Sequence, residues 1–222
     1  MKARFPGLVI FDCDGVLIDS ELLAVEADIA CLVEDGIALS AEEILDRYTG
    51  ISIAGMRADL ERRFGRKLGA DFETRHQQRV EILFAARLRA IPGIEAVLDS
   101  LSCRMCVASS GTPERLRHAL SLVGLFGRFD PHIFSATQVA LGKPAPDLFL
   151  YAAARMGVPP PGDCVVVEDS VAGVTAAVAA GMTAIGFTGG SHCRPGHRDR
   201  LIAHGAALVI ERMEELSPAL MR

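Results

Sequence analysis

The stretch that decides the fold reads Leu8-Val9-Ile10-Phe11-Asp12-Cys13-Asp14-Gly15, a short apolar run that ends in two aspartates and a glycine. Four more short apolar runs follow along the chain, at residues 105–108, 133–134, 164–167 and 183–187. They are rich in valine and isoleucine and do not alternate with polar residues, which is typical of strands buried on both faces of a parallel sheet. We therefore expect a parallel sheet that is covered by helices.

Segments of helical period separate these runs, at residues 114–123, 147–156 and 171–180. Ser170 can cap the last of these helices, and Gly181 can end it. Strands that alternate with helices indicate an open, doubly wound α/β sheet with right-handed crossovers.

One region breaks the alternation. Between residues 20 and 89 every segment has a helical pattern, and the expected helices cover residues 21–34, 41–48, 53–64 and 71–89. Their charges gather on one side, as on amphipathic surface helices. We predict an α/β catalytic core of residues 1–18 and 90–222, with an α-helical cap of residues 19–89 inserted after the first strand.

Composition and charge argue against a nucleic-acid-binding protein and against a membrane-spanning protein. The chain has 222 residues, of which 50% are hydrophobic, and its formal net charge is −5. No basic surplus is available to neutralise a nucleic-acid backbone, so we expect no nucleic-acid partner. Residues 171–187 carry no charge, but the run is too short and too weakly apolar to span a bilayer.

The cysteines and the chain start suggest where the protein works. Six cysteines at irregular positions read as reduced packing residues of a cytosolic protein. Asp12 and Asp14 interrupt the first apolar run, which is unlike the apolar segment of a signal peptide. We expect a cytoplasmic protein without a membrane partner, present as a monomer or a weak homodimer.

Polar residues follow four of the predicted strands: Asp12 and Asp14, then Ser109 and Ser110, then Lys143, and finally Glu168 and Asp169. Ligands of such sheets bind at the carboxyl ends of the strands, so these side chains should converge. Several carboxylates share a small site only with a cation between them, and oxygen ligands favour Mg²⁺. The lysine and the backbone N–H groups after Ser109 suit phosphate oxygens. One aspartate could attack phosphorus while the other protonates the leaving oxygen.

These residues resemble the haloacid dehalogenase-like superfamily, whose four motifs appear in order: D-x-D-G at 12–15, a strand-ending serine at 109, K-P at 143–144 and E-D at 168–169. The resemblance covers essentially the whole chain and implies a Rossmann-like core. A cap inserted directly after the first motif is similar to the β-phosphoglucomutase-like branch, which includes many sugar-phosphate phosphatases.

The resemblance implies a role for each motif residue. Asp12 would be the nucleophile and a metal ligand, and Asp14 the acid/base, with its backbone carbonyl on Mg²⁺. Ser109, Ser110 and Lys143 would hold the phosphoryl group. Asp169 would complete the metal site, with Glu168 either a ligand or a partner behind the ligands.

Residues of the cap are secondary candidates for contact with the substrate. The fourth cap helix carries Arg75 and His76, and in this family that helix often contributes a cation. Ile53 and Arg57 follow the cap loop Gly50-Ile51-Ser52. His192, His197 and His204 have no carboxylate cluster beside them in the sequence, so we expect them in a solvated loop and helix.

The function that these observations favour is Mg²⁺-dependent hydrolysis of a small phosphorylated metabolite, a sugar, sugar-acid or polyol phosphate, through an aspartyl-phosphate on Asp12. Dehalogenation needs neither Asp14 nor the acidic pair at 168–169, and a non-catalytic binding module would predict the loss of a motif residue. A β-phosphoglucomutase-type mutase stays as the alternative. That family has an arginine where this chain has Ile53 and a histidine where it has Ala24, although Arg57 could substitute for the arginine.

Overall fold

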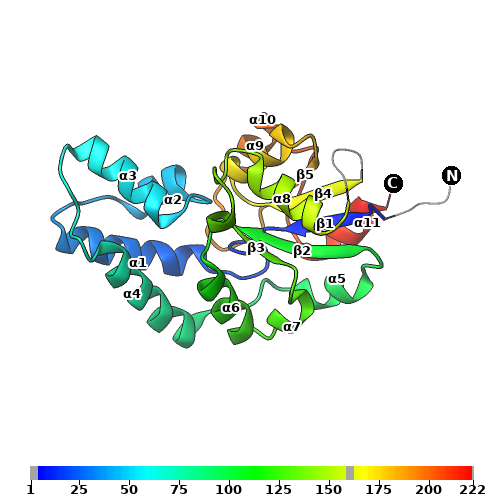
Figure 1. The fold of residues 1–222 in the computed structure, drawn as a ribbon, viewed down its shortest axis with the longest axis horizontal. Helices are drawn as coiled ribbons and strands as arrows, with labels where there is room; N and C mark the ends of the chain where they lie inside the picture. Colours follow the sequence, from blue (N-terminus) through cyan, green and yellow to red (C-terminus); the bar gives the residue numbers. More distant parts are fainter. Residues whose placement is uncertain (1–4, 159–162, 222) are drawn as a thin grey trace.

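The computed structural model describes residues 5–158 and 163–221, and its centre is a parallel sheet (Figure 1). Six strands hydrogen-bond in the order β3-β2-β1-β4-β5-β6. They are β1 (Leu8–Phe11), β2 (Arg104–Ser109), β3 (Ile133–Ser135), β4 (Cys164–Glu168), β5 (Thr183–Phe187) and β6 (Leu208–Ile210). The doubly wound α/β fold is thereby confirmed, and β6 is a strand that the apolar runs did not predict.

Helices cover both faces of the sheet. They are α5 (Ile94–Ser100), α6 (Pro113–Leu122), α7 (Phe126–Phe129), α8 (Asp147–Arg155), α9 (Val171–Ala179), α10 (His197–Ala203) and α11 (Leu216–Leu220). The strand β1 is fully buried, with Val9 and Phe11 in one apolar cluster and Leu8 and Ile10 in the other. Successive side chains of a strand point to opposite faces, so β1 supplies the core on both sides of the sheet.

The register of the central strands brings their carboxyl ends level. Phe11 at the end of β1 lies opposite Val107 in β2 and Val167 in β4. The N–H of Asp12 continues this pattern and donates to the carbonyl of Val167 at 3.0 Å. Residues that directly follow β1, β2 and β4 therefore emerge at the same edge of the sheet.

Four helices lie beside the sheet and match the predicted helical region: α1 (Glu21–Glu34), α2 (Ala41–Tyr48), α3 (Ile53–Phe64) and α4 (Phe72–Arg87) (Figure 1). They share an apolar cluster of their own, with Leu32, Leu60 and Phe72 at its centre. Val80 and Phe84 of α4 belong instead to a cluster of the sheet. The helix α4 therefore packs against both parts of the molecule.

The chain enters and leaves this helical region side by side. Ile18 pairs antiparallel with Ala90, and the N–H of Asp19 donates to the carbonyl of Arg89 at 2.9 Å. The division into a core of residues 1–18 and 90–222 and a cap of residues 19–89 stays a prediction. Residues 1–4, 159–162 and 222 of that core lie outside the described part of the chain.

Among the residues described, no helix combines the length and the apolar character needed to cross a membrane. All six cysteines are free thiols, and four of them are buried.

Candidate active site

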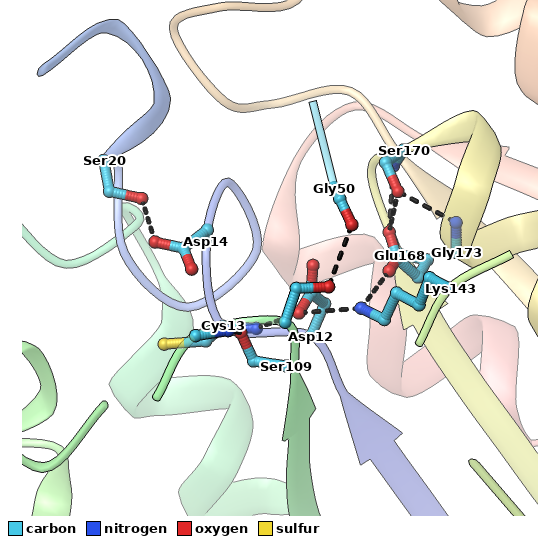
Figure 2. Close-up of polar contacts among 12 residues, drawn as sticks. Asp12, Cys13, Asp14, Ser20, Gly50, Ser109, Lys143, Glu168, Ser170 and Gly173 are labelled. Carbon is cyan, nitrogen blue, oxygen red and sulfur yellow. Dashed lines mark hydrogen bonds and ion pairs between the residues drawn. The ribbon is translucent and has the colours of Figure 1, made fainter. Parts of the chain in front are cut away.

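Polar side chains from separate elements meet at the carboxyl ends of the central strands (Figure 2). Asp12 follows β1, Ser109 ends β2, Glu168 and Asp169 come from the end of β4, and Lys143 precedes α8. Each of these five side chains is buried. Burying a polar or charged group costs free energy unless the group is paired, so the partners of each residue indicate its role.

Lys143 lies between two carboxylates. Its Nζ is 3.0 Å from Oδ1 of Asp12 and 2.5 Å from Oε1 of Glu168, and its side chain is fully buried. Burial alone lowers the pKa of Lys143, but the charges of Asp12 and Glu168 outweigh burial and hold that pKa above its usual range. Lys143 is therefore a permanent cation fixed against Asp12.

Both oxygens of Glu168 already have partners. Oε1 accepts from Lys143, while Oε2 accepts from the Ser170 N–H at 2.9 Å and from the Ser170 hydroxyl at 3.0 Å. Helix α9 packs so closely here that a Cβ on Gly173 would overlap the Glu168 carboxylate. These contacts fit a residue that orients Lys143, and direct metal binding by Glu168 stays a prediction.

The acidic residues at this edge fit a divalent cation. Asp12, Glu168 and Asp169 offer carboxylate oxygens within 4.8 Å of one another. Burial, and then the charge of Glu168, raise the pKa values of Asp12 and Asp169 well above the usual range. Oδ2 of Asp169 is buried without a hydrogen-bond partner. A hard dication such as Mg²⁺ would supply the missing partner and allow Asp12 and Asp169 to ionise beside Glu168, whose pKa, despite burial, Lys143 and Ser170 already lower.

Asp14 lies apart from Asp12 and Lys143 (Figure 2), directly before Gly15, whose φ is 71°. Its Oδ1 accepts from the Ser20 hydroxyl at 2.6 Å, and the two NH groups of Arg115 donate to its two oxygens at 2.7 and 2.8 Å. Burial raises the pKa of Asp14, but the charge and hydrogen bonds of Arg115, together with Ser20, outweigh burial and lower it. Asp14 is thus held as a carboxylate.

The loop between α2 and α3 contacts residues at this edge of the sheet. The hydroxyl of Ser110 donates to the carbonyl of Gly50 at 2.9 Å, and a Cβ on Gly50 would collide with the hydroxyl of Ser170. Gly50 also has a φ of 80°, which favours glycine. The Ser109 hydroxyl accepts from the N–H of Gly111 at 3.2 Å. Phosphate binding by Ser109 and Ser110 stays a prediction.

The cap residues predicted to meet the substrate pair with carboxylates of the cap itself. Arg57 lies 3.2 Å from Glu61 and 3.5 Å from Glu73, Arg75 bonds Asp35 at 2.8 Å, and His76 lies 3.0 Å from Asp28. Ile53 begins α3 and is partly buried. Among the described contacts, none joins these four residues to Asp12, so their role in substrate binding stays a prediction.

Three residues at the site were missed by sequence reasoning: Arg115, Glu21 and His192. Arg115 lies in the first turn of the helix that follows β2, which is the signal that could have revealed it. Glu21 starts α1, where burial and the charges of Asp169 and Asp14 raise its pKa well above the usual range. His192 is only 4% exposed, and its Nε2 is 3.0 Å from Oδ2 of Asp169. The expectation that His192 is solvated was wrong, because its loop folds over the end of β4.

We expect Arg115→Gln to destabilise the protein at pH 7 by about 1–3 kcal/mol, because Asp14 loses its charged partner. Arg115 lowers the pKa of Asp14 below the usual 3.8, so the stabilising effect is complete above pH 3.8 and declines as the pH falls further. The difference in unfolding free energy between the wild type and Arg115→Gln should therefore become smaller below about pH 4. Urea unfolding of the metal-free protein at several pH values measures it, with the exposed Arg117→Gln as the control. An equal loss at all pH values would contradict this assignment.

Comparisons with known proteins point to one family. The family model of the haloacid dehalogenase-like hydrolases matches residues 6–181. The chain is 34% identical over 189 residues to a 6-phosphogluconate phosphatase of Escherichia coli, an alignment that spans 84% of this chain and 85% of that protein.

Two solved structures are similar along almost the whole chain. A haloacid dehalogenase-like protein of Agrobacterium tumefaciens is 39% identical, with a TM-score of 0.82 over 96% of this chain and 97% of its own. A hydrolase from Deinococcus radiodurans, solved with bound phosphate and sodium, is 33% identical, with a TM-score of 0.75 over 98% and 96% of the two chains.

Proposed function

This chain belongs to the haloacid dehalogenase-like hydrolases, and from that premise we propose that it is a Mg²⁺-dependent phosphatase that acts through an aspartyl-phosphate on Asp12. The observation that carries the proposal is the buried pair of Lys143 and Asp12 beside a cluster of carboxylates. In phosphoryl transfer to a carboxylate, a fixed cation beside that carboxylate stabilises the negative charge of the phosphoryl group.

Asp12 is oriented for attack. Its Oδ1 accepts from the N–H of Cys13 at 2.7 Å and pairs with Lys143, so the carboxylate cannot rotate freely. A carboxylate oxygen of Asp12 attacks phosphorus, and the bond from phosphorus to the leaving oxygen breaks. Lys143 and Ser109 hold the equatorial oxygens of the phosphoryl group while negative charge builds on them.

Asp14 serves as acid and then as base. It gives a proton to the leaving oxygen; water then attacks phosphorus, Asp14 takes the proton of that water, and the bond to Asp12 breaks. Asp14 must leave Arg115 to do this, since the ion pair favours its deprotonated form. Rotation away from Arg115 toward the leaving group removes that constraint and raises the pKa of Asp14.

Mg²⁺, when bound, neutralises the carboxylates and the phosphate oxygens so that two anions can approach each other. The residues that would hold it are Asp12, Asp169 and the backbone carbonyl of Asp14. Glu168 orients Lys143 behind them, because both of its oxygens are engaged.

The substrate is a small phosphorylated metabolite. The cap loop meets the core at Gly50 and Ser110, directly over the phosphate site, and a covered site suits a small molecule better than a protein surface. Similarity to a 6-phosphogluconate phosphatase favours a sugar, sugar-acid or polyol phosphate. A cytoplasmic location and a monomer or weak homodimer remain predictions.

We expect Asp12→Asn to lower Mg²⁺-dependent phosphate release by at least about a thousandfold, because the amide is a poor nucleophile. Release of phosphate from p-nitrophenyl phosphate and from 6-phosphogluconate measures the effect, and circular dichroism verifies the fold. Asp99→Asn, an exposed change on α5, is the matched control. Turnover by Asp12→Asn at the rate of this control, or wild-type turnover that survives EDTA, would overturn the mechanism.

Water rather than a sugar hydroxyl should accept the phosphoryl group. A mutase needs a cation in the cap for the second phosphate of its bisphosphate intermediate, but the cap loop leads into Ile53, and Arg57 is paired with Glu61 and Glu73. A lost charge-assisted contact of this kind costs about 2–3 kcal/mol.

With β-glucose 1-phosphate as substrate, we therefore expect free phosphate to appear faster than glucose 6-phosphate. Following both products by phosphorus NMR decides between the two acceptors. Faster formation of glucose 6-phosphate would assign the chain to the mutases, and no release from any phosphate ester would favour a non-catalytic module.

A further inference from the structure

The loop between β5 and α10, with the first residue of α10, brings three nitrogen and sulfur ligands together beside Asp169. They are His192, Cys193 and His197, and their ligand atoms lie within 4.8 Å of one another. Sγ of Cys193 is 3.4 Å from Nε2 of His192. The rings of His192 and His197 pack edge to face, with their centroids 5.9 Å apart. This set contains no carboxylate, so its chemistry differs from that of the site around Asp12.

The cluster is held in place by the core. His192 is 4% exposed, and a Cβ on Gly15 or Gly190 would come within 2.9 Å of its ring. Nε2 of His197 lies 2.6 Å from the backbone carbonyl of Asp169. The short chain segment from Gly190 to His197 thus lies against Asp169.

One buried oxygen beside this cluster, Oδ2 of Asp169, has no hydrogen-bond partner. Oδ2 of Asp169 is 3.0 Å from Nε2 of His192, yet the two atoms are not in hydrogen-bonding geometry. A cation bound to Nε2 of His192 would lie beside this carboxylate oxygen and would compete with Mg²⁺ for it. Asp169 would then be the fourth ligand of a mixed site.

The ligand types select the ion. Zinc binds imidazole and thiolate in tetrahedral geometry, in which the nitrogen and sulfur ligands are about 3.6 Å apart. The observed separation of 3.4 Å between His192 and Cys193 is close to that value. Mg²⁺ prefers oxygen ligands and does not compete for such a site.

We propose that His192, Cys193 and His197 bind Zn²⁺ next to the Mg²⁺ site, and that the bound Zn²⁺ inhibits the enzyme by drawing the Asp169 carboxylate toward itself. Burial and the Asp169 charge keep the free Cys193 a neutral thiol, because they raise its pKa. As the sulfur–zinc bond forms, the thiol proton therefore leaves to solvent. The inhibitory part of the proposal rests on the phosphatase function proposed above.

Co²⁺ titration of the protein in excess Mg²⁺ tests the site without reference to activity. We expect one ion per chain and a near-ultraviolet charge-transfer band from thiolate to cobalt, which Zn²⁺ removes when it displaces Co²⁺. Cys193→Ser should abolish the band, and His197→Gln should weaken Co²⁺ binding at least about tenfold. Cys103→Ser and His204→Gln, at positions outside the cluster, are the matched controls. Absence of the band, or a band that survives in Cys193→Ser with its fold intact by circular dichroism, would overturn the site.

The inhibitory effect is measured as the ratio of phosphate release with and without Zn²⁺ for each variant in excess Mg²⁺. We expect this ratio to be at most about one tenth in the wild type and in Cys103→Ser, because the Mg²⁺ site loses one carboxylate ligand. In Cys193→Ser we expect the ratio to stay near one. Inhibition that persists in Cys193→Ser, or a cobalt band without inhibition by Zn²⁺, would overturn the coupling to Asp169. A wild type that shows the cobalt band but never releases phosphate would contradict the phosphatase function and leave the zinc site standing.

Discussion

The pair of contacts that Lys143 makes with Asp12 and Glu168 is the interaction on which the site depends. Each of these groups is buried, so none is stable as an ion without the others. The sheet supplies two of them from adjacent strand ends, Asp12 after β1 and Glu168 from β4. Ser170 and the close approach of α9 at Gly173 then fix Glu168, and through it the lysine. The fold therefore holds the lysine cation against the carboxylate of Asp12, which we propose as the nucleophile.

The two aspartates of the first motif have pKa values that their surroundings shift in opposite directions. Asp12 lies among other carboxylates, which together with burial raise its pKa, whereas Asp14 is bonded to Arg115 and Ser20, which lower its pKa. During turnover, a cation beside Asp12 would lower the pKa of Asp12. A phosphate that displaces Asp14 from Arg115 would raise the pKa of Asp14. Identical side chains two positions apart can then act as a nucleophile and as an acid.

Much of this could be predicted from the sequence, because β1 to β5 are apolar runs and the motif residues at 12–14, 109 and 168–169 stand at the ends of three of them. The helices α5, α7, α10 and α11 span four to seven residues each, too few for a helical period to stand out, and the strand β6 was not predicted. Arg115 and His192 were missed or misread for another reason. Their partners, Asp14 and Asp169, are distant in sequence, and only the folded chain brings them together.

Chemical identification of the phosphorylated residue tests the central claim most directly. The enzyme would be quenched in acid during turnover and treated with borohydride, which reduces an aspartyl-phosphate to homoserine. Mass spectrometry of the peptide that contains Asp12 and Asp14 then locates the change. The account predicts homoserine at residue 12 and an unchanged aspartate at residue 14. Homoserine at residue 14, or none in a sample that was releasing phosphate, would contradict it.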